Sequence, residues 1–190
     1  MEQKRIALQE VVITYELLQR TARPANPLAE KTALEAIAAT TPDGRDAILH
    51  ALCRVGLELC KAGSCGINLL EGVGENRVFR WAVIEGVFAP HQGGTGPADH
   101  SPCGYVYERK SAQLLCRSAR YFEWMQAVDI PVHESLIVPL HLNKDDIIGT
   151  IWAVSHDDAH RFDREDLRIL TLLSSHAIAA LKVHESMYQA

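Results

Sequence analysis

The segment that decides the fold reads TGPADHSPCG and spans residues 95–104. It contains two prolines and two glycines, and it separates two regions whose residues alternate as in β-strands. Because proline lacks a backbone donor and glycine adopts many backbone conformations, this segment forms neither a plain helix nor a continuous strand. It also carries a carboxylate, an imidazole and a thiol. We expect it to shape the wall of a pocket.

Composition places the chain among ordinary globular proteins. Its 190 residues fit a single domain, with 47% hydrophobic and 23% charged residues. The net charge of -5 and the scattered Lys and Arg residues argue against nucleic acid as a partner. No uncharged apolar run approaches the ~20 residues that span a bilayer, and no signal-peptide core follows residues 1–5. We therefore expect a cytoplasmic protein, without membrane contact, whose five cysteines are reduced.

Apolar residues at helical spacing predict three helices before the first strand. The first covers residues 6–20 and ends before the proline-containing segment 23–27. The second begins after Asn26, a good capping residue, and stops near residues 41–44. The third carries apolar residues along one side from Ile48 onward.

After residue 64 the period changes from helical to alternating, which predicts strands. Residues 65–70 and 78–84 form one antiparallel hairpin, and residues 135–142 and 147–154 form a second. Pro139 cannot donate to a β-ladder, so it marks a bulge or a position that faces the sheet edge. Between the hairpins we expect a short helix near 106–108, a short strand over 113–116 and one or two helical turns within 120–127.

A long final helix is predicted after Asp163, which can cap it, and it runs to about Met187. Two apolar stripes lie roughly a third of a turn apart on this helix. One stripe can pack on the sheet, which leaves the other for an N-terminal helix of the same chain or for a second subunit. The first stripe comprises Leu167, Leu170, Ala177 and Leu181, and the second comprises Ile169, Leu172, Leu173, Ala180, Val183 and Met187.

Short motifs accompany this order of elements: DAIL (46–49) with LC (52–53), AG (62–63), GINLLE (66–71), SPCG (101–104), LIVPL (136–140), GTIW (149–152), SHDD (155–158), RFD (161–163) and EDL (165–167). Together they resemble the GAF domain family over roughly residues 44–183, and most closely the GAF domains found in front of bacterial sensor histidine kinases. The resemblance implies a PAS-related α+β fold. Helices would pack on one face of a five- to six-stranded antiparallel sheet, and loops and short helices would form a pocket on the other. We therefore assign residues 1–43 to an N-terminal helical extension and residues 44–187 to a sensory domain.

The resemblance also implies how such a domain works. Members commonly bind a small ligand, dimerise through their terminal helices and pass a signal to an output domain. We find no kinase, cyclase or DNA-binding stretch in this sequence, so the domain either belongs to a larger sensor or works alone or on a separate protein. We expect a homodimer through the N- and C-terminal helices that signals to a histidine kinase or another output protein.

Cys103 is the candidate for covalent chemistry. Its thiol could anchor a chromophore, ligate a metal or act as a redox nucleophile, or it could serve as a small buried hydrophobe. Free methionine sulfoxide reductases of the GAF family use one thiolate to attack the sulfoxide and a second thiol to resolve the intermediate. Cys103 resembles one of their cysteines, but residues 132–135 lack the other. A Cys103-dependent reductase is therefore the alternative to a non-enzymatic sensor, and a module that serves only as a dimerisation scaffold is a third possibility.

Other polar motifs carry little specific information. Asp99-His100 and His133-Glu134 are acid–imidazole pairs that suit either a pH response or ordinary loop hydrogen bonds. No metal-ligand spacing occurs, and the glycine-rich residues 93–96 lack the Lys-Ser/Thr of a phosphate loop. Bilin-binding members of the family carry a Cys-His dipeptide at the start of the pocket helix, whereas His100 here precedes Cys103 by three positions. No cofactor is assigned, because nothing specifies haem, bilin, cyclic nucleotide or metal.

Aromatic residues give the better indication of a ligand, although core packing explains them equally well. They lie on strands or segments that border the predicted cavity. The candidate pocket residues are Trp81, Phe88, Asp99, His100, Cys103, Tyr121, Phe122, Trp124, His133 and Trp152.

Overall fold

The computed structural model describes residues 6–188, with side chains up to Lys182. Its centre is a six-stranded antiparallel sheet in the order β3-β2-β1-β6-β5-β4. The strands are β1 (Ser64–Glu71), β2 (Val78–Gly86), β3 (Thr95–Pro97), β4 (Gln113–Cys116), β5 (Glu134–His141) and β6 (Ile147–Ser155). The helices are α1 (Glu16–Gln19), α2 (Pro27–Ala39), α3 (Arg45–Leu59), α4 (Pro102–Arg109) and α5 (Arg164–Tyr188).

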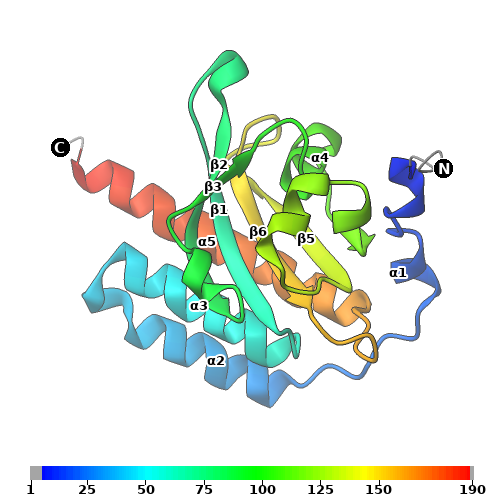
Figure 1. The fold of residues 1–190 in the computed structure, drawn as a ribbon. Coiled ribbons are helices and arrows are strands. Elements are labelled where there is room, and N and C mark those ends of the chain that lie inside the picture. Colours follow the sequence, from blue (N-terminus) through cyan, green and yellow to red (C-terminus); the bar gives the residue numbers. More distant parts are fainter. Residues whose placement is uncertain (1–5, 189–190) are drawn as a thin grey trace.

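Helices cover the two faces of the sheet unequally (Figure 1). On one face, here called the helix face, α3 and α5 pack on the strands, and α2 packs against α3. On the other, the pocket face, lie α4 and the irregular segment 118–132, which includes the 3-10 helices Ser118–Arg120 and Glu123–Val128. The α+β fold expected from the sequence is therefore confirmed.

Strand alternation divides the core between these faces. On β5, Leu136 and Val138 join the helix-face core, whereas Ser135 and Ile137 face the pocket side. Successive side chains of a strand point to opposite faces, so each strand supplies side chains to both cores. A register shift in β2 adds one residue, Ala82, between the pairs on either side. Such a bulge reverses the alternation beyond it.

Most predicted elements are present. Both hairpins, α2, α3 and α5 occupy the expected segments, and the Asn26 side chain accepts a hydrogen bond from Ala29 N at 3.1 Å. Asp163 Oδ1 accepts hydrogen bonds from the backbone N of Glu165 at 2.7 Å and of Asp166 at 3.2 Å, which caps α5. Pro139 on β5 lies beyond the residues that pair with β4, so the side of Pro139 away from β6 is an edge of the sheet.

The predicted helix over residues 6–20 is wrong. A 3-10 turn, Leu8–Glu10, and the short α1 are joined by an extended stretch that runs antiparallel alongside β4. Ile13 N donates to Leu114 O, and Cys116 N donates to Val11 O, each at 2.8 Å. The unpaired edge of β4 thus draws this segment into sheet pairing, which overrides its helical spacing. The boundary between residues 43 and 44 stays a prediction.

Two arginines fasten this N-terminal segment to the domain. Arg20 donates to both carboxylate oxygens of Glu134, at 2.9 and 2.7 Å, and hydrogen bonding to Glu134 raises the pKa of Arg20. Arg23 pairs with Asp166 at 2.6 Å, in the first turn of α5. The segment therefore connects the β4 edge to the start of the last helix.

Helix α5 uses residues from both predicted stripes within its own chain. Ile169, Leu170, Leu173, Ala177 and Leu181 are all buried, and the helix packs against α3 and the sheet. This supports the intramolecular interpretation of the second stripe as far as Leu181. The side chains of Val183 and Met187 lie outside the described residues. Within the part of the chain that the structure describes, no helix is both long and apolar enough to cross a membrane.

Candidate ligand-binding site

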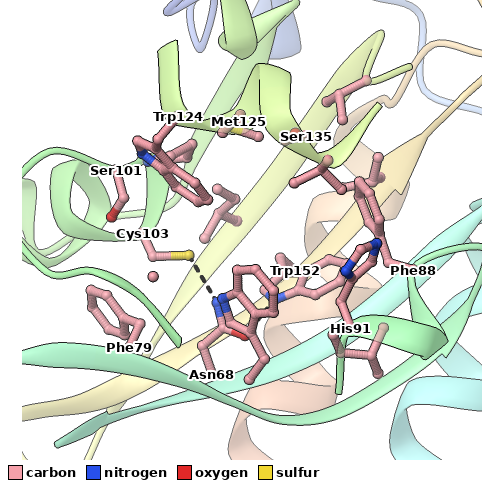
Figure 2. Close-up of a pocket in the computed structure, with 18 of the residues that line it drawn as sticks. Asn68, Phe79, Phe88, His91, Ser101, Cys103, Trp124, Met125, Ser135 and Trp152 are labelled. Atoms are coloured by element: carbon pink, nitrogen blue, oxygen red, sulfur yellow. Dashed lines mark hydrogen bonds between the residues drawn. The ribbon is translucent and has the colours of Figure 1, made fainter. Parts of the chain in front are cut away.

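A cavity of about 100 Å³ lies between the pocket face of the sheet and the segments that cover it (Figure 2). Strands β1, β2, β5 and β6 form its floor, while β3, α4 and the segment 118–132 supply its walls. Its lining consists of Asn68, Phe79, Trp81, Ile84, Phe88, His91, Gly96, Pro97, Ser101, Pro102, Cys103, Trp124, Met125, Val128, Ile130, Val132, Ser135, Ile137, Trp152 and Val154.

The floor depends on a glycine. Gly66 on β1 pairs directly with Trp152 on β6, and a Cβ at Gly66 would lie 2.3 Å from Trp152 Cζ2. Without that Cβ, the indole lies across β1 and its Nε1 donates to Asn68 Oδ1 at 3.0 Å. Residue 66 must therefore be small for the indole to occupy this position.

Asn68 connects this indole to the candidate thiol. Its Nδ2 donates to Cys103 Sγ at 3.2 Å, and the sulfur points into the pocket (Figure 2). Burial raises the pKa of the Cys103 thiol, and the side chains of Thr150 and Asn68 only partly oppose that increase. The sulfur at this position is therefore a protonated thiol at neutral pH, which is a poor nucleophile.

The segment that opens α4 fixes Cys103 in place. Ser101 caps the helix by accepting a hydrogen bond from Gly104 N at 3.0 Å, and Pro102 occupies its first turn. A Cβ at Gly104 would lie 2.0 Å from the Ala98 carbonyl oxygen, so only glycine permits this close approach. The proline–glycine pattern of residues 95–104 thus produces a short edge strand followed by a helix start.

Aromatic rings form much of the wall. Trp81 stacks on Trp124, with ring centroids 6.4 Å apart and an interplanar angle of 25°. Phe88 meets Trp152 edge-on at 6.2 Å. Trp124 Nε1 donates to the His100 carbonyl at 2.8 Å, which ties the covering segment to the loop before α4. All three tryptophans of the chain line this one pocket.

Five of the ten predicted residues line the pocket: Trp81, Phe88, Cys103, Trp124 and Trp152. The other five lie outside its wall, for reasons that differ between loop and core positions.

Asp99 and His133 form ion pairs or hydrogen bonds at the surface. The exposed Asp99 pairs with Arg77 at 3.2 Å, and His133 Nδ1 lies 3.1 Å from Asp158 Oδ1. Neither side chain contributes to the pocket wall.

His100, Tyr121 and Phe122 pack together beside the pocket. The His100 ring lies 5.3 Å from the Tyr121 ring and 5.2 Å from the Phe122 ring, and Phe122 is buried. These rings support the segment 118–132 from outside the cavity.

Residues that the sequence analysis did not select also shape the site, chiefly Asn68, Ser135 and Gly66. Asn68 and Ser135 are polar residues within largely apolar strands. Their side chains lie on the same face of the sheet as the aromatic residues of the pocket. Their place in the period-two pattern was the available signal. In the described part of the chain, no group of three or more His, Cys, Asp or Glu residues could hold a metal ion.

Comparisons with known proteins agree with this architecture. The family model of the GAF domain matches residues 43–182. A GAF domain from a phosphoenolpyruvate-protein phosphotransferase of Coxiella burnetii superposes with a TM-score of 0.70 at 15% identity, covering 87% of this chain and 100% of that chain. The second GAF domain of DevS from Mycobacterium smegmatis gives a TM-score of 0.60 at 17% identity, covering 74% and 95%.

An enzyme also has this fold. The free methionine-R-sulfoxide reductase of Neisseria meningitidis, in complex with its substrate, gives a TM-score of 0.68 at 15% identity and covers 88% of this chain and 96% of that chain. No curated protein sequence matches this chain significantly. Identities this low establish the shared fold alone, whereas the family model spans well over half of the sequence. The chain belongs to the GAF domain family.

Proposed function

We propose that this protein is a sensory domain that binds a small molecule in the pocket between the sheet and α4. The observation that carries the proposal is the cavity itself, which is walled by aromatic and aliphatic side chains and has a few polar groups on its floor. This combination is typical of sites for small organic ligands. The GAF family, to which the chain belongs, commonly serves such a role.

We further propose that occupancy is transmitted to the terminal helices through β5. Ser135 lines the pocket, and its neighbour Glu134 is buried against Arg20 and accepts a hydrogen bond from Phe162 N at 3.0 Å, just before α5. A shift of β5 would therefore act on both the N-terminal segment and α5. A ligand changes such an equilibrium only if it binds one arrangement more tightly than the other.

The proposed output is a homodimer that acts, in the cytoplasm, on a histidine kinase or another effector through its N- and C-terminal helices. Helix α2 supports this role because it buries Ala33 and Ile37 inward yet leaves Leu28 75% exposed. The five unpaired cysteines are consistent with a reducing compartment.

Tryptophan emission gives a direct test of ligand binding, because every tryptophan lines the pocket. We expect at least one member of a metabolite panel to change the emission, raise Tm and slow hydrogen exchange in α5. If no compound changes emission or Tm, the sensory proposal fails. Sedimentation at micromolar concentration that shows only a 21.1 kDa monomer would contradict the dimer.

The alternative is a Cys103-dependent reductase, which the inward-facing thiol and the likeness to a sulfoxide reductase favour. Reduction would require a second thiol to form a disulfide with Cys103 after attack on the sulfoxide. Among the residues that line the pocket, Cys103 is the one cysteine, and Cys53, Cys60 and Cys65 lie in the helix-face core.

The enzyme alternative predicts that free methionine sulfoxide is reduced with added thiol and that Cys103→Ser abolishes turnover, while Cys116→Ser serves as the matched control. The sensory proposal predicts no Cys103-dependent turnover. It also predicts slow alkylation of Cys103, since burial raises the pKa of its thiol.

A further inference from the structure

The charge of the side chains that line the pocket restricts the kind of ligand that can bind. Among its described lining residues there is no Arg, Lys, Asp or Glu, and only His91 and Cys103 can ionise. His91 contacts Trp81 and Phe88 edge-on, at 6.2 and 6.1 Å between ring centroids. A charged ligand would lose hydration here without gaining a carboxylate or guanidinium partner. The wall therefore favours an uncharged molecule.

The cavity also limits ligand size. An apolar cavity of roughly 150 Å³ accommodates a benzene molecule. The volume here, about 100 Å³, is of the same order. This volume excludes fused-ring and larger ligands in the arrangement that the structure describes.

The lining favours a planar ring within that size limit. Trp81 and Trp124 form a stacked pair in the wall, and Phe88 and Trp152 meet edge-on. Aromatic rings attract one another in stacked and edge-on geometries beyond the effect of buried area. Aromatic ligands can therefore use contacts that a branched aliphatic molecule of equal volume cannot.

Ser135 is a polar side chain of the wall that remains available to such a ligand. Ser135 is 3% exposed and lines the pocket, and its hydroxyl makes no hydrogen bond within the part of the chain that the structure describes. By contrast, Asn68 already engages Trp152 and Cys103 through its amide. A hydroxyl that opens onto a largely apolar cavity gains from a ligand that supplies a hydrogen-bond partner there.

We propose that this pocket selects an uncharged, single-ring aromatic molecule whose one polar substituent hydrogen-bonds to Ser135. The inference rests on the proposed sensory function and specifies the ligand class of the same site.

Four probes of similar size test this class: toluene, p-cresol, 4-methylbenzamide and 4-methylbenzoate. Binding to the full chain is measured by tryptophan emission and isothermal titration calorimetry at neutral pH. We expect p-cresol to bind about fivefold more tightly than toluene, which is the contribution of one neutral hydrogen bond. The amide should bind at least tenfold more tightly than the carboxylate of the same shape.

The variant Ser135→Ala separates recognition from folding. It should remove the preference for p-cresol over toluene while leaving the toluene affinity within about twofold, since a single hydroxyl is lost. Ser175→Ala, at an exposed position on α5, is the matched control and should change neither value. Toluene affinity also reports whether the Ser135 variant has folded with an intact pocket.

Each contrary outcome identifies a different failure. Equal or tighter binding of the carboxylate would overturn the uncharged class but leave the sensory proposal intact. An unchanged p-cresol preference in Ser135→Ala would overturn the role of Ser135. If none of the four probes binds while a larger metabolite does, the ligand class is wrong and the sensory function stands. If neither the probes nor the panel bind, both fail.

Discussion

The helix face and the pocket face of the sheet differ in the side chains that cover them. The helix-face core is largely aliphatic and almost wholly buried, with Leu52, Leu136 and Leu170 at 0% exposure. The pocket face gathers all three tryptophans, and Trp81 and Trp124 are only half-buried. The helix face thus resembles the close-packed interior of any small domain, whereas the pocket face retains an open cavity.

This difference lets one sheet combine a stabilising core with an open cavity, which is the proposed binding site. Because neighbouring residues of a strand point to opposite faces, dense packing on the helix face can hold the strands while the other face stays incompletely filled. Strand β5 illustrates the division, since Leu136 packs under α5 and Ser135 meets the cavity. Changes on the helix face should alter stability, and changes on the pocket face should alter ligand response.

The largest expected effect is at Glu134, which is 1% exposed. Its carboxylate accepts hydrogen bonds from Arg20 and from Phe162 N. Glu134→Ala removes these and leaves partly buried donors unpaired, which should cost about 3–5 kcal/mol of unfolding free energy. Urea titration measures this loss. Glu134→Gln keeps the shape and should lose less.

A double-mutant cycle checks that Arg20 is responsible. Arg20→Ala and Glu134→Ala should be strongly non-additive, because either change alone breaks the same pair. Additive losses would show that the N-terminal segment is not fastened through this contact.

The next effect compares adjacent residues on β5. Leu136→Ala opens a space in the helix-face core and should cost about 2–5 kcal/mol. Ile137→Ala, on the pocket face, should also destabilise, because Ile137 is 3% exposed. Ligand response distinguishes the two variants: an added ligand should raise the Tm of Leu136→Ala as much as that of the parent, and that of Ile137→Ala less. Equal responses would contradict the separation of the two faces.

The sequence predicted the elements whose patterns are local. Alternation marked both hairpins, and Asn26 and Asp163 correctly marked the starts of α2 and α5. The segment 6–20 defeated the same reasoning, because hydrogen bonds from β4, which lies about a hundred residues later, determine its conformation. Such long-range pairing leaves no trace in local spacing.

The site was predictable only in part. Aromatics on regular strands, Trp81 and Trp152, were placed correctly because strand geometry fixes their direction. Asp99 and His100 lie in an irregular turn, where composition does not determine whether a side chain faces solvent or cavity. Ser135 was overlooked because a single serine in a strand also suits an exposed position.

The third effect tests the pocket floor. Gly66→Ala places a Cβ 2.3 Å from Trp152 Cζ2 and must displace the indole from Asn68. Overpacking of this kind costs about 1–3 kcal/mol. Tryptophan emission should change and ligand affinity should fall. Adding Trp152→Phe should recover part of the stability, because the smaller ring clears the new methyl group. Unchanged emission in Gly66→Ala would show that the indole does not depend on residue 66.

The smallest effect concerns Asp163 and acidity. Burial raises the pKa of Asp163, but backbone N–H groups of Arg23, Glu165 and Asp166 together lower it below its usual value. The unfolded carboxyl has a pKa of about 3.9. Ionised Asp163 therefore contributes stability above about pH 4, and this contribution is lost as the pH falls through the lower folded-state value.

Asp163→Asn keeps a capping side chain and should cost about 1 kcal/mol at neutral pH through the lost charge. The difference in unfolding free energy from the parent should shrink as the pH falls below 4, as measured by urea titration at each pH.

Asp166→Asn should show the opposite pH dependence of stability, because burial raises the pKa of Asp166. Its ionisation is unfavourable in the folded state, so the replacement should become relatively more stabilising as the pH rises through that value. A parallel response of both variants would contradict the distinct roles of these carboxylates. Both lie in the α5 cap, away from the residues that line the pocket, so neither replacement should alter the affinity for p-cresol.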